Sequence, residues 1–165
     1  MTTARQHGRT AGADPLPSSR TAILPLEGRL LGVDWGEKRI GLAISDPTQT
    51  VATPLGTLTR RAGKRFPMGQ LKPHLETHQP VGVVVGLPLD ASGGEGPAAR
   101  AARDIGALIA AKTGLPVTYW DERMTTARVR RAQQETGRTR GRVPREADPL
   151  AATLVLQTFL DRRRS

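Results

Sequence analysis

Apolar and polar residues follow a strand-like pattern over residues 30–58. The segment LLGVD, residues 30–34, is a short apolar run that ends in Asp34. In IGLAIS, residues 40–45, large apolar residues alternate with small ones, a period of two that is typical of a half-buried strand. The two segments are joined through Gly36-Glu37-Lys38, which predicts a hairpin. The segment 51–58 is a third extended segment, and its Pro54 predicts an edge strand. Together they predict an antiparallel meander.

Beyond the meander the pattern alternates between helix and strand. The run VGVVVGL, residues 81–87, is continuously apolar, as expected of a parallel strand that is buried on both faces. From Pro97 an apolar stripe predicts a helix, which Gly114 and Pro116 end. Thr125 is the expected N-cap of a later helix. The full pattern adds helices over about 66–78, 97–113, 125–135 and 148–162, and strands over 81–87 and 117–120. This order predicts an α/β fold with a mixed five-stranded sheet flanked by helices.

Length and composition bound the domain organisation. The chain has 165 residues, which fits one domain, expected over 28–165. Residues 1–27 are rich in Thr, Ser, Arg, Gly and Pro without apolar periodicity, and they predict a flexible tail. There is no Cys, which excludes disulfides and thiolate metal sites. No run approaches the roughly 18 apolar residues of a membrane span, so we expect a cytoplasmic protein without a membrane partner.

The charge of the chain favours a polyanionic partner. Lys and Arg number 25 against 15 Asp and Glu, a formal net charge of +10, and nucleic acid is the first expectation for such a surplus. Arginine forks onto two phosphate oxygens, so a run of arginines suits this role, although such runs are usually solvated helix faces and loops. The residues expected to contact nucleic acid are Lys38, Arg39, Arg123, Arg128, Arg130, Arg131, Arg138, Arg140, Arg142 and Arg145.

Three acids stand at places that can converge. Asp34 ends the first strand, Glu122 follows the last strand, and Asp148 opens the last helix. The ends of neighbouring parallel strands gather at one edge of a sheet, and a helix packed across the sheet can bring a further acid there. Clustered carboxylates need a cation, and hard oxygen ligands without Cys favour one or two Mg²⁺ or Mn²⁺ ions. Such ions can generate a hydroxide nucleophile and neutralise a departing oxyanion.

Each of these acids has a purely structural alternative. Asp34 can bond the amides of the turn at Gly36. Glu122 can form a surface ion pair with Arg123, and Asp148 can cap the last helix before Pro149. The spacing by itself leaves these alternatives open.

The chain resembles the YqgF family, also called RuvX-like, over roughly residues 30–160. The motifs that carry the resemblance are GVDWGEKRIGLAISD, VVVGLPLDASGGEG, DERMTT and ADPLAATLVLQTFL. The family comprises bacterial Holliday-junction resolvases that are also described as pre-16S ribosomal RNA nucleases. One departure is the loop after Pro88, which usually has the form Asn-x-Asp-Gly and here reads Asp90-Ala91-Ser92-Gly93.

The resemblance implies an RNase H-like fold and divalent-metal-dependent cleavage of phosphodiester bonds. By position it implies Asp34, Glu122 and Asp148 as catalytic and metal-binding residues. The expected substrate is a four-way DNA junction, as in recombination and repair, or precursor 16S rRNA, as in ribosome biogenesis. A junction has two symmetric cuts, which suggests a homodimer. The alternative is a nucleic-acid-binding or ribosome-binding module without catalysis. A second alternative is an ATP-using sugar-kinase or actin-like fold, which would need two such domains and more than twice this length.

Overall fold

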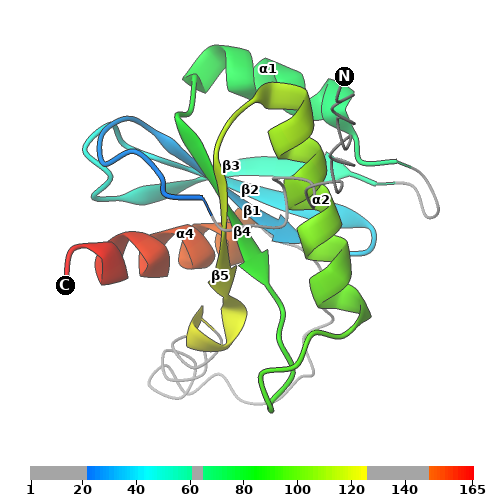
Figure 1. Cartoon of the computed structure of the whole chain (residues 1–165). Coiled ribbons are helices and arrows are strands. Elements are labelled where there is room, and N and C mark those ends of the chain that lie inside the picture. The colour runs from blue at the N-terminus through cyan, green and yellow to red at the C-terminus, as the bar shows by residue number, and fades with distance from the viewer. Residues whose placement is uncertain (1–21, 61–64, 126–148) are drawn as a thin grey trace, which may run out of the picture.

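A mixed five-stranded sheet forms the centre of the domain (Figure 1). The computed structural model describes residues 22–60, 65–125 and 149–165. The strands are β1 (Leu30–Trp35), β2 (Arg39–Ser45), β3 (Ala52–Thr59), β4 (Gly82–Leu87) and β5 (Val117–Asp121), and the helices are α1 (Met68–His78), α2 (Pro97–Thr113) and α4 (Pro149–Arg163). No helix within these ranges is both long and apolar enough to cross a membrane.

The strand pairing confirms the predicted mixed sheet. The spatial order is β3-β2-β1-β4-β5. β1, β2 and β3 pair antiparallel as a meander, whereas β4 is parallel to both β1 and β5. Pro54 lies in β3 at the edge of the sheet, as predicted, opposite Ala43 and beside a register shift in the pairing of β2 with β3. All six residues of β4 are buried, as its continuous apolar run predicts.

Side chains that alternate along β1 divide the core into two layers. Leu31 and Val33 belong to the apolar cluster that includes residues of α1 and α2, whereas Leu30 belongs to the cluster that includes residues of α4. Figure 1 shows this arrangement, with α1 and α2 on one face of the sheet and α4 on the other. The position of a residue in a strand therefore decides which helix its side chain meets.

The helix α4 rests directly on the backbone of β1 at Gly32. A Cβ atom at this position would lie 2.9 Å from Cβ of Leu156 and 3.1 Å from the carbonyl oxygen of Ala152. Neither atom is the free end of a flexible side chain, so the helix itself would have to move. The absence of a side chain at Gly32 thus sets how closely α4 approaches the sheet.

We expect Gly32→Ala to lower the free energy of unfolding by about 1–3 kcal/mol, because the added methyl group overpacks the contact with α4. Urea denaturation measures this change. The control is Gly69→Ala in α1, where an added Cβ meets nothing within 4 Å. An equal loss of stability in both variants would show that the contact at Gly32 is not tight.

Residues 22–27, which the sequence assigned to the tail, are anchored to the domain. Leu24 is buried, and the Ala22 N–H donates to the carbonyl oxygen of Val117 at 3.1 Å. The Arg163 guanidinium donates to the carbonyl oxygens of Leu24 and Pro25, and Gln49 Nε2 also donates to Pro25 at 2.9 Å. The expected flexibility of residues 1–21 lies outside the described residues and stays a prediction.

The turn between β2 and β3 is organised by the carboxylate of Asp46. One oxygen accepts the N–H groups of Thr50 at 2.7 Å and Val51 at 2.9 Å, and the other accepts the Thr48 hydroxyl. These hydrogen bonds, with the Thr48 hydroxyl as the largest cause, lower the pKa of Asp46 from its ordinary value of 3.8 to about 2. The ionised carboxylate is therefore the form that holds this turn.

Because folding lowers the pKa of Asp46, its contribution to stability is full above about pH 4 and is lost as the pH falls towards 2. We expect Asp46→Ala to lower the urea midpoint at pH 7 and the difference from wild type to shrink below pH 4. Asp104→Ala, at an exposed position of α2, is the control. A difference that stays constant between pH 7 and pH 2.5 would contradict this role of the carboxylate.

Candidate active site

Asp34 is a buried carboxylate at the carboxyl end of the central strand. It is 8% exposed and follows Leu30 and Gly32 on the face of β1 that α4 covers. The parallel register pairs Val33 with Val85, so the next residue, Asp34, lies beside Gly86 of β4. An ionised group in such a place needs hydrogen bonds or a cation.

Glu122 lies on the same face, on the other side of Gly86. The indole of Trp120 faces α4, where its Nε1 donates to Oγ1 of Thr158 at 3.1 Å. A Cβ atom at Gly86 would lie 2.7 Å from Oε1 of Glu122 and 3.2 Å from Cγ2 of Val155 in α4. Gly86 therefore leaves room for the Glu122 carboxylate, and the ends of three adjacent strands bring two of the three predicted acids to one rim of the sheet.

The third predicted acid lies outside the described residues. Asp148 precedes the first described residue of α4, Pro149, and the seven arginines predicted between Arg128 and Arg145 are likewise outside the described ranges. Among the described residues, no group of three or more His, Cys, Asp or Glu could hold a metal ion. Two carboxylates with no sulfur donor nearby nevertheless suit a hard divalent ion such as Mg²⁺ or Mn²⁺. The role of Asp148 stays a prediction.

Cations surround the hairpin that carries Asp34. Lys38 and Arg39 are exposed at the turn between β1 and β2, next to the acid rim. Arg60, which the sequence analysis did not select, joins them because its N–H donates to the Lys38 carbonyl at 2.8 Å. Its guanidinium lies 5.7 Å from the centre of the Trp35 ring. The signal that could have found it is the basic run Arg60, Arg61, Lys64 and Arg65 directly after the third strand.

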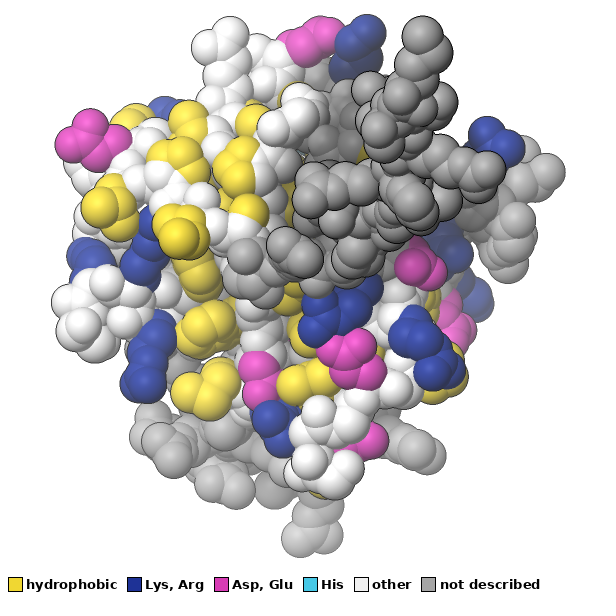
Figure 2. All heavy atoms as spheres, viewed as in Figure 1, with side chains coloured by type: hydrophobic (Ala, Val, Ile, Leu, Met, Phe, Trp, Pro, Cys, Tyr) yellow, Lys and Arg dark blue, Asp and Glu magenta, His cyan; other side chains and the backbone are white. Residues whose placement is uncertain are grey.

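Basic side chains do not form one continuous patch on the described surface that Figure 2 shows. Lys and Arg side chains there are interspersed with Asp and Glu. A uniformly positive face would be expected of a protein that binds polyanions by charge alone. The described surface in this view therefore does not by itself identify a site for a polyanion.

Arg123, predicted to contact nucleic acid, is paired with Asp121. Its Nε lies 3.0 Å from Oδ2 of Asp121 and its Nη2 2.7 Å from the same oxygen. The backbone N–H of Arg123 also donates to Oδ1 of Asp121 at 2.9 Å. The guanidinium hydrogen bond is the main reason why the pKa of Asp121 lies below its usual range. The ion pair of Arg123 in the structure is thus with Asp121, its neighbour on the other side of Glu122.

The helix that follows β5 begins earlier than predicted. The chain is already helical at 122–125, so Thr125 is not an N-cap. The cap is Asp121, whose carboxylate accepts an N–H of the first helical turn. Thr125 is buried instead, and its hydroxyl lies 3.3 Å from that of Thr158 in α4.

The loop that departs from the family pattern is closed by its own aspartate. Oδ1 of Asp90 accepts the N–H groups of Ser92 at 3.0 Å and Gly94 at 2.7 Å, and the Ser92 hydroxyl at 2.6 Å. The Ser92 hydroxyl is the main reason why the pKa of Asp90 is lowered. The Arg123 guanidinium lies against this loop, because a Cβ at Gly93 would be 3.4 Å from its Nη1. The loop therefore contacts the segment that carries Glu122.

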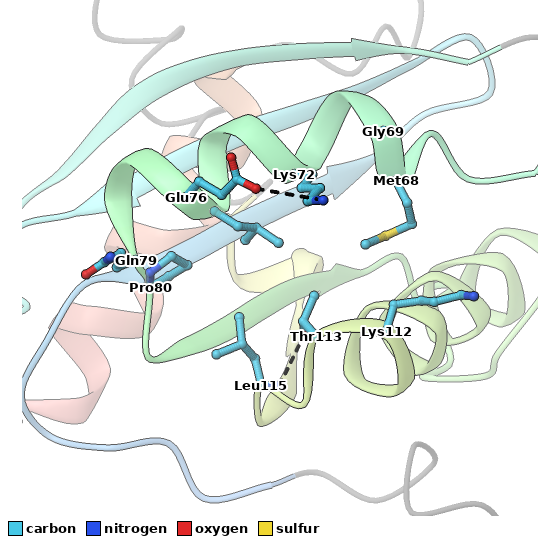
Figure 3. Close-up of a pocket in the computed structure, with 10 residues that line it drawn as sticks. Met68, Gly69, Lys72, Glu76, Gln79, Pro80, Lys112, Thr113 and Leu115 are labelled. Atoms are coloured by element: carbon cyan, nitrogen blue, oxygen red, sulfur yellow. Dashed lines mark hydrogen bonds and ion pairs between the residues drawn. The ribbon is translucent and has the colours of Figure 1, made fainter.

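A groove of about 620 Å³ lies at the other end of the sheet and is not the acid site (Figure 3). Met68 and Leu75 of α1 line one side of it, and Leu115 lies just before β5. Its single acid, Glu76, lies 3.9 Å from Lys72, as the dashed line shows. A groove with this lining offers no set of oxygen donors for a metal ion.

Comparisons with known proteins agree with the motifs and the fold. Residues 28–162 match the family model RuvX, described as Holliday junction resolvase. A protein of Paramagnetospirillum magneticum named "Putative pre-16S rRNA nuclease" is 39% identical over 148 residues, which cover 89% of this chain and 94% of the relative. A protein of the same name from Rhodobacter capsulatus is 40% identical over 141 residues, 86% of this chain and 88% of the relative.

Among solved structures, one similar fold is that of T. thermophilus RuvC in complex with a Holliday junction substrate. Its TM-score is 0.51 at 15% sequence identity, and the match covers 84% of this chain and 96% of that chain. This likeness confirms the predicted RNase H-like fold.

We expect Gly86→Ala to displace the Glu122 carboxylate and to weaken Mn²⁺ binding by about tenfold or more, the usual effect of disturbing the support of a metal ligand. The electron paramagnetic resonance signal of free Mn²⁺ measures the affinity. Gly69→Ala is the matched control, because it adds the same methyl group in open space. An unchanged Mn²⁺ affinity in Gly86→Ala would show that the Glu122 carboxylate does not bind the metal ion.

Proposed function

Because the chain belongs to the RuvX family, as its sequence motifs predict, we propose that it is a metal-dependent endonuclease that cleaves phosphodiester bonds of structured nucleic acid. The observation that supports this most directly is the pair of carboxylates, Asp34 and Glu122, on one face of the sheet with Gly86 between them. Both lie at strand ends, where a ligand can approach from outside the sheet.

Asp34, Glu122 and Asp148 would hold one or two Mg²⁺ or Mn²⁺ ions. An ion bound there supplies Lewis-acid chemistry at a phosphate and at water. The protein contributes the fixed placement of the oxygen donors. Asp34 is held by a central strand that is buried on both faces, and Glu122 by a helical turn that packs on α4.

The cations near the rim would hold the nucleic acid. Three of these cations, Lys38, Arg39 and Arg60, lie at the hairpin that carries Asp34. The predicted arginines from Arg128 to Arg145 lie between Glu122 and Asp148 in the sequence. Contacts with phosphates release counterions, so binding would weaken steeply as salt rises. These side chains would fix the position of the cleaved bond relative to the carboxylates.

Two substrates fit this chemistry, a four-way DNA junction and precursor 16S rRNA. The family description names the first, and the names of the relatives give the second. A homodimer would serve a junction, because two subunits related by a two-fold axis present two equivalent sites. Action in the cytoplasm stays a prediction.

We expect Asp34→Asn and Glu122→Gln each to lower the rate of cleavage at least about 100-fold, because each removes a charged donor from the rim. Cleavage of a synthetic four-way junction and of a precursor 16S rRNA fragment, with Mg²⁺, Mn²⁺ or EDTA, measures this. EDTA should abolish the wild-type reaction. The substrate that is cut identifies the activity.

The control variant is Glu76→Gln, which removes an exposed acid at the distant groove. It should cleave like wild type. The alternative, a binding module without catalysis, predicts tight binding of nucleic acid that neither EDTA nor Asp34→Asn changes. That result, together with no cleavage by wild type, would replace the nuclease proposal.

A further inference from the structure

Asp121 and Glu122 are neighbours in the chain but lie on opposite faces of the sheet. The hydroxyl of Tyr119 donates to the carbonyl oxygen of Arg103 in α2 at 3.1 Å, so Tyr119 faces α2. Asp121 follows it by two positions and shares that face. Glu122 lies on the α4 face, against Gly86 and Val155. β5 ends at Asp121 and the chain is helical from residue 122, so the register of this strand-to-helix junction decides which face the Glu122 side chain takes.

The contacts of Arg123 hold this register. Its guanidinium forks onto Asp121, with Nε 3.1 Å from Oδ1 and 3.0 Å from Oδ2 and with Nη2 2.7 Å from Oδ2. Its backbone N–H is bound by the same carboxylate. The Asp121 carboxylate thus holds Arg123 through both its main-chain N–H and its guanidinium. The residues directly before and after Glu122 are therefore bound to each other.

A second contact ties this pair to the loop 90–94. The guanidinium lies over Gly93, where a side chain would meet Nη1 at 3.4 Å and Nη2 at 3.7 Å. The loop is closed around the Asp90 carboxylate and lies in the segment that connects β4 to α2. Arg123 therefore bridges the end of β5 to a second, independently fixed loop.

We propose that Arg123 is a positioning residue, which with Asp121 clamps the end of β5 so that the Glu122 carboxylate stays on the metal-binding face. This inference rests on the proposed function and deepens it. Arg123, the arginine of the DERMTT motif, then acts on the face opposite Asp34 and Glu122, in place of a contact with phosphate. The clamp acts on the placement of Glu122 and leaves the grip on nucleic acid to the other cations.

Electrostatics alone makes a different prediction for each partner. Removing the positive charge of Arg123 would strengthen cation binding nearby, and removing the negative charge of Asp121 would weaken it. A clamp predicts that both changes weaken binding. A phosphate contact predicts a third pattern, in which only the loss of Arg123 matters and the slope of log K against log salt falls by about one.

The experiment compares wild type with Arg123→Gln, Asp121→Asn and the double variant. Asparagine retains the N-cap, so Asp121→Asn isolates the pairing with the guanidinium. We expect each single variant to raise the Mn²⁺ concentration for half-maximal binding, measured by electron paramagnetic resonance, about tenfold. The KM for nucleic acid and the salt dependence of binding should not change, whereas kcat at low metal should fall. The double variant should be no worse than either single variant, because both remove the same contact.

Glu95→Gln is the matched control, because it breaks the pair between Arg103 and Glu95, whose side chains are 33% and 36% exposed. It should leave Mn²⁺ binding unchanged. A similar loss in this variant would mean that any broken surface pair has the effect, and the clamp would be wrong. It would also be wrong if Arg123→Gln raised the KM and lowered the salt slope while Asp121→Asn behaved like wild type.

The outcomes separate the clamp from the nuclease proposal. If wild type shows no metal-dependent cleavage of either substrate, the proposed function falls whatever the variants do. If wild type cleaves and both single variants bind Mn²⁺ as tightly as wild type, only the clamp falls.

Discussion

Helices cover both faces of the sheet, and this burial restricts where the domain can place charge. Every residue of β4 is buried, and Asp34 is the single acid within β1. A carboxylate inside such a layer can stay ionised only where a strand ends and a cation or water can approach. The convergence of Asp34 and Glu122 at one rim follows from this constraint together with the parallel pairing of β1, β4 and β5.

The absence of a side chain at Gly32 and Gly86 makes this rim possible. α4 approaches the backbone of β1 at Gly32, and the Glu122 carboxylate occupies the space that Gly86 leaves open. Both contacts lie on the same face, so one helix covers the sheet up to the acids and also contacts the turn that carries Glu122 through Thr158. The stability of this layer and the placement of the donors are therefore coupled.

The sequence was sufficient for the features that arise from local pattern. Alternation predicted the hairpin of β1 and β2, the continuous run predicted β4, and Pro54 predicted the edge position of β3. Asp34 and Glu122 were selected because both stand at strand ends. The family motifs then predicted the RNase H-like fold, which is defined by the order of the elements.

Features that depend on contacts between distant segments were missed or misplaced. The partner of Arg123 depends on which face each residue takes after β5, and spacing along the chain does not determine this. Arg60 reaches the hairpin between β1 and β2 only because β3 returns beside β2. The helix after β5 was expected to begin at Thr125, since Asp121 becomes a cap only once the strand ends there. Asp148 and the arginines around 128–145 stay predictions.

The anchoring of residues 22–27 has a consequence for how the domain is connected to anything attached to it. Arg163, near the last residue of the chain, bonds the carbonyl oxygens of Leu24 and Pro25, so the two ends of the folded domain meet. Leu24 also lies against Gly82, at the start of β4 and thus at the opposite end of the strands from the acids. A fusion partner or a linker that joins the two ends would therefore emerge on the side away from the rim and leave the approach to Asp34 and Glu122 open.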